Sequence, residues 1–366
     1  MVEWKKLGEI CEIGTGSNNR EDACEDGLYP FYVRSQDVLR IDSFLFDEEA
    51  ILIPGEGGVG DIFHYINGKY GLHQRTYRVH PISDSIIGKY IYYYLFANFK
   101  TYINQKSYKS TAASIRKPML TDFPICFPSL SEQQRIVEQL DTFTSSIENL
   151  KEQIAQRRKQ YEYYRDQLLD LEGKEGVEMK KLGNICKIGD GLHGTPIYDE
   201  NGDYFFINGN NLSDGKIILK LETKKVDIEM FRKYGVELDE ESILMSINGT
   251  IGNVAQYRNE KIVLGKSAAY FRIKNKNVLH FKYLYYFLQT TKANEYYNGA
   301  LTGSTIKNLG LKAIRDFDIP ITSLAEQQRI VSILDTFEAS IRNLEQQLAQ
   351  REKQYEYYRN KLLTFE

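Results

Sequence analysis

A glycine-rich segment is the first feature of the sequence whose residue types suggest chemistry. Gly55–Gly60 reads GEGGVG, and glycines in this density can form a loop that cradles phosphate. No GK[ST] tail follows, so the segment is not a P-loop. It is also a weak candidate for an S-adenosylmethionine loop, because its counterpart Asn248–Gly252 reads NGTIG and fits a tight turn. We therefore expect a duplicated turn here rather than a cofactor site.

The histidines do not form a catalytic or metal-binding pattern either. No ligand spacing occurs among His64, His73, His80, His193 and His280, and there is no methyltransferase motif of the Asn-Pro-Pro-Tyr type. A histidine at position 64 or 73 could act as a general base, but a solvated or hydrogen-bonded loop histidine is the simpler interpretation. The sequence thus predicts a chain with no catalytic residues, no bound metal and no cofactor of its own.

Cysteine usage and hydropathy indicate a cytoplasmic protein. No CxxC pair occurs among Cys11, Cys24, Cys126 and Cys186, so we expect reduced thiols and no zinc site. No apolar run follows Met1–Lys6, and no segment approaches the roughly 18 apolar residues of a membrane span. We therefore expect neither a signal peptide nor a membrane partner.

Polar loop residues are the remaining candidates, and their chemistry suits recognition of DNA. Lys and Arg neutralise phosphates, while Ser, Thr and backbone N–H groups bond phosphate oxygens. Arg can bind guanine in bidentate fashion, Asn or Gln can bind adenine, and Asp can accept from cytosine. Segments that differ between the two halves, Arg34–Asp37 and Asn208–Asn211, are the best candidates for base reading. For each single residue a structural turn is an equal alternative. The residues that we predict to contact DNA are Ser17, Asn18, Asn19, Arg20, Arg34, Ser35, Gln36, Asp37, Arg75, Lys106, Tyr108, Lys109, Ser110, Arg116, Lys117, His193, Thr195, Asn208, Asn210, Asn211, Lys266, Ser304, Thr305, Lys307 and Asn308.

Charge is distributed unevenly along the chain. The net charge of -3 argues against a polyanion partner, but Ser85–Thr121 holds six Lys and Arg and no acid. Lys261–Arg315 holds ten Lys and Arg against the single acid Glu295. Two basic tracts on a nearly neutral chain fit a polyanion that is bound at two places.

The candidate residues lie on a chain that is written twice. Ser131–Val137 reads SEQQRIV and returns 194 residues later as Ala325–Val331, which reads AEQQRIV. Trp4–Gly14 returns as Met179–Gly189 with an offset of 175, so the second globular part is about 19 residues longer. The repeat predicts the order domain, helix, domain, helix.

Each SEQQRIV-type segment opens a long helix. Capping boxes run from Ser129 to Glu132 and from Ser323 to Glu326, and no Gly or Pro interrupts either helix. Apolar residues recur at alternating spacings of four and three, which favours a coiled coil over a helix packed on its own domain. Some 40 residues at about 1.5 Å each give a rod of roughly 60 Å. The predicted seam is Ile136, Leu140, Phe143, Ile147, Leu150, Ile154 and Tyr161, with Ile330, Leu334, Phe337, Ile341, Leu344, Leu348 and Tyr355.

Connectivity predicts that the two helices run antiparallel. The first helix leaves domain one and ends at domain two, and the second must return if the two seams meet. With aligned ends, Tyr161 lies opposite Phe337 and Tyr355 lies opposite Phe143. The single charge in the first seam, Arg157, would then help to fix the register at a cost in stability.

The expected fold class is mixed α/β, with two similar domains separated by two long antiparallel helices in a pseudo-twofold repeat. Aromatic and β-branched runs such as Pro30–Arg34 and Tyr204–Ile207 predict strands. The Tyr-rich segments Lys89–Phe99 and Phe281–Thr290 predict one helix in each half. The predicted domains are 1–128 and 173–322, and the predicted long helices are 129–172 and 323–366.

These repeated motifs resemble the specificity subunit of type I restriction-modification systems. The resemblance rests on Lys6–Gly14 and Lys181–Gly189, which read KLGEICEIG and KLGNICKIG, and on the duplicated Glu-Gln-Gln-Arg-Ile-Val helix entry. It covers essentially the whole chain and implies two target recognition domains, each reading half of a split sequence in double-stranded DNA. The helices would set the unread spacer, at under ~18 base pairs for ~3.4 Å each.

The resemblance also implies partner subunits that perform the reactions. Modification subunits, expected to number two, would dock on the paired helices, bring S-adenosylmethionine and methylate DNA. Restriction subunits would cleave with ATP and Mg²⁺. Three alternatives stay open on the sequence alone: an orphan or methylation-only specificity protein, a coiled-coil scaffold whose domains bind protein, and an enzyme with a hidden site. Salt separates DNA binding from protein binding, because contacts to phosphates weaken steeply as salt rises.

Overall fold

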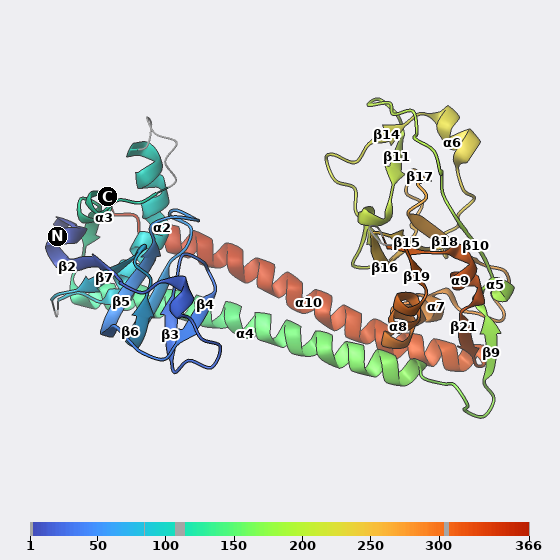
Figure 1. The fold of residues 1–366 in the computed structure, drawn as a ribbon, viewed down its shortest axis with the longest axis horizontal. Helices are drawn as coiled ribbons and strands as arrows, with labels where there is room; N and C mark the ends of the chain where they lie inside the picture. The colour runs from blue at the N-terminus through green and yellow to red at the C-terminus, as the bar shows by residue number, and fades with distance from the viewer. Residues whose placement is uncertain (1–2, 84, 107–113, 304–306, 366) are drawn as a thin grey trace. The chain divides into compact units, whose positions relative to one another are not determined.

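The computed structural model describes residues 3–83, 85–106, 114–303 and 307–365. The chain forms two compact units, Met1–Lys151 with Gln346–Glu366, and Glu152–Glu345 (Figure 1). We call them unit 1 and unit 2. Each unit holds one globular domain together with part of both long helices, so residues from both ends of the chain build unit 1.

The domain of unit 1 is built around a six-stranded sheet with the order β2-β7-β5-β6-β3-β4. Neighbouring strands are antiparallel except β3 and β6, which are parallel. The apolar run Ala50–Ile53 of β5 is fully buried, as expected for a central strand covered on both faces. The elements are β1 (Glu3–Lys6), α1 (Leu7–Ile10), β2 (Cys11–Thr15), η1 (Arg20–Asp22), β3 (Tyr29–Tyr32), β4 (Val38–Ile41), β5 (Phe46–Pro54), β6 (His64–Leu72), β7 (Thr76–Pro81), α2 (Gly88–Lys106), α3 (Lys117–Thr121) and β8 (Pro124–Phe127).

The domain of unit 2 repeats this plan with an insertion. Strands β10, β18 and β15 correspond to β2, β7 and β5, and β11 pairs in parallel with β17 as β3 does with β6. The insertion carries the β12–β13 hairpin and α6, whereas β14 pairs antiparallel with β11 as β4 does with β3. The elements are β9 (Glu178–Lys181), α5 (Leu182–Ile185), β10 (Cys186–Asp190), β11 (Tyr204–Ile207), η2 (Gly209–Asn211), β12 (Leu212–Ser213), β13 (Lys216–Ile217), β14 (Lys225–Val226), α6 (Ile228–Tyr234), β15 (Ile243–Asn248), β16 (Thr250–Gln256), β17 (Ile262–Leu264), β18 (Ala268–Ile273), α7 (Phe281–Phe287), α8 (Thr291–Gly299), β19 (Leu301–Thr302), β20 (Asn308–Leu309), α9 (Leu311–Asp316) and β21 (Asp318–Ile321).

The Tyr-rich helix of unit 2 is shorter than the sequence predicted. Helix α7 ends at Phe287 and has 7 residues, whereas its counterpart α2 has 19 residues in all. The side chain of Thr290 accepts a hydrogen bond from the backbone N–H of Ala293 at 3.2 Å and caps the new helix α8. The prediction of one helix over Phe281–Thr290 was therefore wrong at its end, because a local N-cap restarts the chain in a new direction.

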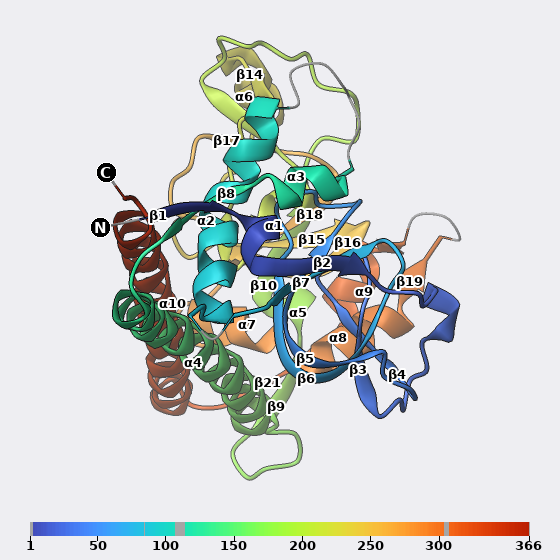
Figure 2. The ribbon, with the colours of Figure 1, turned by 90° about the vertical axis from the view of Figure 1, so that its left-hand side faces the viewer.

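The two long helices are α4 (Leu130–Leu169) and α10 (Leu324–Leu362), and they pair antiparallel within each unit. In unit 1, the ring of Phe143 stacks on Tyr358 with centroids 5.3 Å apart. In unit 2, Tyr164 stacks on Phe337 at 5.4 Å. Figure 2 shows α4 and α10 side by side at unit 1. The mixed α/β class and the antiparallel helix pair predicted from the sequence are confirmed.

The register of the pair differs slightly from the predicted one. The ring stacked on Phe337 is that of Tyr164. The Arg157 guanidinium carbon also lies over Phe337, 5.9 Å from the ring centroid. The predicted partner Tyr161 instead contacts Tyr286 of α7, with centroids 6.4 Å apart. Tyr161, which was predicted to lie in the seam between the long helices, therefore packs against the domain of unit 2, because α4 also covers the core of that domain.

The apolar stripe of each helix is shared between the helix pair and the two domains. The first turns, with Ile136 and Leu140 in α4, are fully buried in the core of unit 1. Tyr355, in the last turns of α10, and Leu363, directly after the helix, join the same core. Ile330 and Leu334 of α10 do the same in unit 2. Within the described part of the chain, no helix is both long enough and apolar enough to cross a bilayer.

A buried glutamine anchors each long helix to its domain. Gln133 is fully buried; its Oε1 accepts from the Ile87 N–H at 3.0 Å, and its Nε2 donates to the carbonyl oxygens of Ser85 and Pro128. Gln327 makes the matching contacts in unit 2, to His280, Val278 and Thr322. The first Gln of the repeated Glu-Gln-Gln-Arg motif thus fixes the entry of the Tyr-rich helix against the long helix.

Candidate nucleic-acid interface

In each domain, the loop that follows the strand β2 or β10 passes very close to a neighbouring strand. A Cβ atom on Gly16 would lie 1.8 Å from the carbonyl oxygen of Leu72, and one on Gly191 would lie 1.9 Å from that of Leu264. Only glycine permits this crossing. It allows Asn18 to donate its N–H to Leu72 at 3.2 Å. The polar loops that follow are therefore held at the same end of both sheets.

We call this end of each sheet the polar edge. Its described residues in unit 1 are Asn18, Asn19, Arg34, Glu56, His73, Gln74 and Arg75, and in unit 2 they are His193, Asn208, Asn248, Lys266, Ser267 and Asn308. They come from loops that β-bridges place in register: Asn18 with His73, and Glu56 with Ser114. In unit 2, Leu192 bridges Gly265 and Asn248 pairs with Asn308.

The polar edge of unit 1 is charged. Glu56 accepts a hydrogen bond on Oε2 from Arg34 Nη1 at 3.1 Å and another from Arg75 Nη1 at 2.9 Å. These two guanidinium groups, Arg75 first, hold the pKa of Glu56 below its ordinary value. Beside them, Gln74 Nε2 donates to Asn19 Oδ1 at 2.6 Å. The structure thus brings together predicted DNA contacts from three separate loops.

Two histidines lie beneath these charged groups. His73 is buried and accepts the Arg75 N–H on Nδ1 at 3.0 Å. Burial, followed by the positive charges of Arg34 and Arg75, lowers the pKa of His73. His64 is also buried, which lowers its pKa, and its Nε2–H donates to the Ser35 carbonyl at 3.1 Å. Both act as neutral supports of the loops, in line with the simpler interpretation of the sequence.

At the places of Arg34 and Arg75, the polar edge of unit 2 carries the neutral side chains of Asn208 and Ser267. Ser267 Oγ donates to Asn208 Oδ1 at 2.9 Å and accepts from the Gly209 N–H at 2.9 Å. Asn211 is buried and holds the loop through the carbonyl of Ile218, so its side chain acts within the fold. Asn210 stays exposed between them.

A small pocket opens at this edge of unit 2. Its volume is about 420 Å³. His193, Lys266 and Asn308 line it, together with Asp190 and Asn248. The His193 ring nitrogen Nε2 lies 2.9 Å from Asp190 Oδ2, which fixes the ring at the mouth. The structure therefore collects three of the predicted DNA contacts around one polar hollow.

The other predicted contacts are placed less tightly. Ser17, Arg20, Gln36 and Asp37 are exposed near the unit 1 edge, and Ser35 Oγ donates to the Asp37 carbonyl at 3.0 Å. Arg116 is exposed at the N-cap of α3, just before Lys117, and Thr195 and Lys307 are exposed in unit 2. Lys106 ends α2, and its side chain is outside the description. The residues outside the described ranges are Tyr108, Lys109, Ser110, Ser304 and Thr305.

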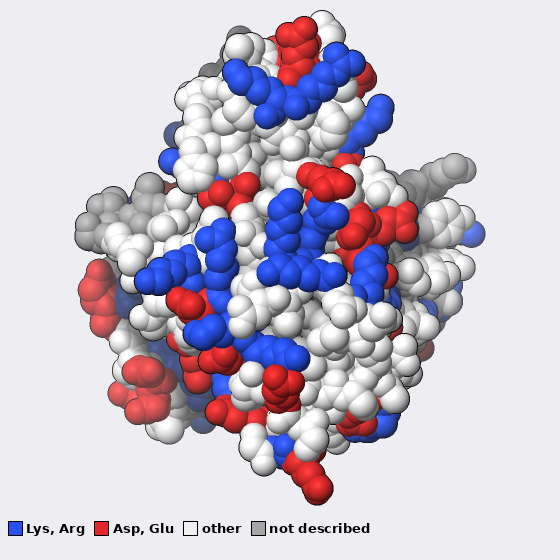
Figure 3. All heavy atoms as spheres, turned by 90° about the vertical axis from the view of Figure 1, so that its right-hand side faces the viewer, with Lys and Arg blue, Asp and Glu red and all other residues white. Residues whose placement is uncertain are grey.

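Among the described residues, several cations of the second basic tract are paired with acids. In unit 2, Arg272 pairs with Glu237 at 2.6 Å, and Lys276 pairs with Glu241 at 2.7 Å. On the face that Figure 3 draws, acids lie among the Lys and Arg groups. The excess charge that the tract shows in sequence is therefore partly neutralised in the fold. Lys266 makes no ion pair within the described part of the chain, and it lies at the polar edge.

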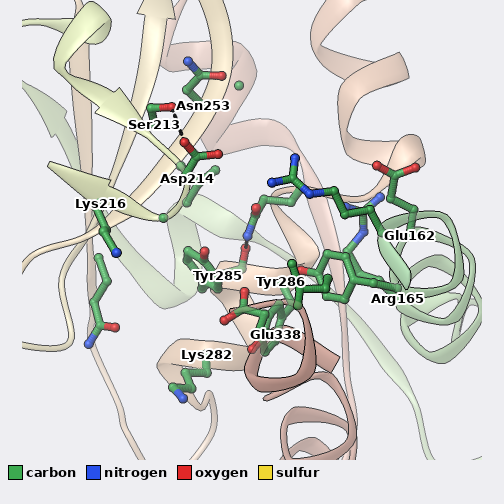
Figure 4. A pocket seen from close by; sticks show the side chains of 18 of the residues that line it. Glu162, Arg165, Ser213, Asp214, Lys216, Asn253, Lys282, Tyr285, Tyr286 and Glu338 are labelled. Atoms are coloured by element: carbon green, nitrogen blue, oxygen red, sulfur yellow. Dashed lines mark hydrogen bonds between the residues drawn. The ribbon is translucent and has the colours of Figure 1, made fainter. Parts of the chain in front are cut away.

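A second hollow in unit 2 has a different character. A polar cleft of about 560 Å³ separates the β12–β13 hairpin, with Asp214 and Lys216, from Arg165 of α4, Tyr286 of α7 and Glu338 of α10 (Figure 4). Burial raises the pKa of Glu338. Among the described residues, no group of three or more His, Cys, Asp or Glu could hold a metal ion.

The sequence missed several residues of the polar edge. Glu56 and Asn248 lie in the duplicated turns, and the turn itself is confirmed by positive φ angles at Gly57 and Gly249. Gln74 and Ser267 follow strands that the sequence did not mark. One signal was available: the turns are duplicated, but one copy holds Glu where the other holds Asn.

Comparisons with known proteins agree with this architecture. A family model described as "Type I restriction modification DNA specificity domain" matches residues 1–157 and 174–353. A putative type I restriction enzyme specificity subunit of Haemophilus influenzae is 28% identical over 394 residues, covering 100% of this chain and 96% of the relative. The EcoR124I/EcoR124II specificity subunit of Escherichia coli is 32% identical over 262 residues, covering 65% of this chain and 60% of the relative.

Solved structures show the same fold. The S subunit of a type I restriction-modification system from M. genitalium aligns with a TM-score of 0.63 at 16% identity, covering 100% of this chain and 97% of that chain. Since the family model extends over most of both halves, membership does not depend on one motif. The chain belongs to the family of type I restriction-modification DNA specificity domains.

Proposed function

We propose that the chain is the DNA-specificity subunit of a type I restriction-modification enzyme and that each domain reads one half of a split target. The observation that carries this proposal is that one family model matches both halves of the chain. The duplicated polar edges support it, since each lies at the same end of its sheet and presents side chains with base-reading chemistry.

The two domains read different sequences in this proposal. Their polar edges differ in charge, with Arg34, Glu56 and Arg75 in unit 1 and the neutral Asn208 and Ser267 in unit 2. Because base contacts specify and phosphate contacts position, unlike residues at matching places select unlike base pairs. The target is then two unrelated blocks with an unread spacer between them.

Partner subunits carry out the chemistry in this proposal. Modification subunits supply S-adenosylmethionine and transfer its methyl group to DNA, and restriction subunits use ATP and Mg²⁺. This chain contributes binding and orientation. Support comes from the polar edge of unit 1, where the charged and amide groups bond one another and the buried His64 and His73 support the loops.

Two equivalent surfaces on the long helices are suited to receive two modification subunits. Tyr163 is 62% exposed and its repeat counterpart Tyr357 is 60% exposed. In unit 2, Tyr163 and Phe337 line a groove of about 710 Å³ with the cation of Lys159 beside it. Exposed aromatic rings next to cations are typical of protein interfaces.

The test is to map methylated positions in DNA after co-expression of the chain with the modification subunit of its own system. We expect two short blocks at a fixed separation. A single unsplit block would contradict the proposal, as would methyl transfer by the purified chain alone.

A further inference from the structure

We propose that Glu56 is a specificity-determining residue that holds Arg34 and Arg75 in position to read guanine in the half-site of domain 1. This inference rests on the proposed function and adds which base the domain reads and which side chains read it. Nothing in the repeated motifs points to Glu56, and its counterpart in unit 2 is the neutral Asn248.

The geometry leaves the reading edges of both arginines open. Each arginine uses only Nη1 to reach Glu56, and both bonds end on the single oxygen Oε2. The Nε and Nη2 groups of each guanidinium make no hydrogen bond to another described residue. A bidentate contact with guanine O6 and N7 needs two N–H groups on one edge of the guanidinium, and each arginine has such an edge to offer.

The carboxylate also sets the net charge of the cluster. Arg34, Glu56 and Arg75 are all solvent-accessible, with 42–56% of each side chain exposed. Two unpaired guanidinium groups side by side would repel one another and would attract any phosphate. With Glu56 between them the cluster carries one net positive charge instead of two. Attraction to phosphate, which does not depend on sequence, is then weaker, and base contacts supply a larger share of the binding energy.

The comparison with unit 2 points in the same direction. There, Ser267 Oγ donates directly to Asn208 Oδ1, so the matching loops are joined without a charged group. An Asn side chain pairs with adenine rather than guanine. The two polar edges thus share one backbone plan, but the arginines of unit 1 suit guanine and the asparagine of unit 2 suits adenine.

The experiment uses the full chain in complex with its modification subunit, with methylated sites mapped for each variant. We expect Arg34→Ala and Arg75→Ala each to relax one position of the same half-site, and that position to be a G·C pair in the wild-type target. Discrimination there should fall by about 10-fold to 100-fold. Asn208→Ala should relax only the other half-site, which identifies the half read by domain 1.

Glu56→Gln provides the direct test of the positioning role. It should loosen both guanine positions together and raise affinity for non-specific DNA, with a steeper salt dependence than the wild type. Lys69→Ala is the matched control, because Lys69 is an exposed cation of the same domain that lies over Phe44. It pairs with Asp47 near the start of β5, whereas Glu56 follows the end of that strand. This variant should leave the motif unchanged.

The outcomes separate this inference from the proposed function. If the wild-type complex marks no split target, the proposed function fails. If it marks a split target but the arginine variants relax no position, or relax an A·T pair, the guanine assignment is wrong. Where Arg34→Ala abolishes methylation altogether, Arg34→Lys keeps the charge without the planar fork. It should relax the same G·C position, and an unchanged motif in that variant would also overturn the inference.

Discussion

Gln133 Oε1 accepts the Ile87 N–H at 3.0 Å from inside a fully buried site at the root of α4. The same side chain donates to two carbonyl groups, so its removal takes the hydrogen-bond partner from three backbone groups, one of them in a buried bond. We expect Gln133→Ala to lower the free energy of unfolding by about 2–4 kcal/mol, measured by urea denaturation. The exposed neighbour Gln134→Ala is the control and should change it by less than about 0.5 kcal/mol. Equal effects of the two variants would show that the buried amide does not anchor the helix.

Gly16 supports a second prediction, which concerns the polar edge rather than the core. An added methyl group at Gly16 would overlap the Leu72 carbonyl, so the loop from Asn18 onward must move. Gly16→Ala should destabilise the chain by about 1–3 kcal/mol and blur recognition of one half-site while leaving the other intact. Gly14→Ala, two residues earlier in β2, is the matched control, since its Cβ would meet only Arg78 at an ordinary 3.5 Å. Methylation mapping with both variants decides the matter.

Glu338 supports a prediction about pH. Burial raises its pKa in the folded state above the ordinary value of 4.5, so the folded chain binds this proton more tightly than the unfolded chain. The carboxyl group therefore favours folding at low pH, and its cost appears as pH rises from 4.5 through the raised pKa. Glu338→Gln should flatten this dependence and raise the melting temperature at pH 7.5 more than at pH 4.5. Glu162→Gln, an exposed acid lining the same cleft, should not.

The exposed tyrosines of the long helices give a prediction about stoichiometry. Tyr163→Ser and Tyr357→Ser should each weaken the binding of one modification subunit, and together they should weaken both. The loss of an aromatic anchor at an interface is worth about 2 kcal/mol, or roughly 30-fold in affinity. Native mass spectrometry of the complex at limiting concentration would count the subunits. An undiminished count in the double variant would place the docking surface elsewhere.

Local sequence patterns predicted much of the architecture. The duplicated entry motif located the starts of α4 and α10, and the alternating spacing of apolar residues predicted that they pair. The register of the two helices was harder to predict from the sequence. Tyr161 and Tyr164 are both seam-like tyrosines, and the choice between them depends on Tyr286, more than a hundred residues away.

The polar edge shows the same limit. Arg34 was found because its residue type suits base reading, but Glu56 was hidden within a glycine turn whose local pattern indicates only a turn. Asn211 matched the base-reading pattern too, yet it is buried and bonds the Ile218 carbonyl. Residue type predicts what a side chain can bond, whereas the fold decides whether that capacity faces solvent.

Domain 1 contains a piece of the other end of the polypeptide. Leu363 is 4% exposed and belongs to the same hydrophobic cluster as Leu7 and Tyr90. During synthesis on the ribosome, the nascent domain 1 must wait for almost the entire chain to emerge before this cluster closes. Until then the apolar surface that Leu363 covers stays exposed, so the domain of unit 1 is completed after the domain of unit 2.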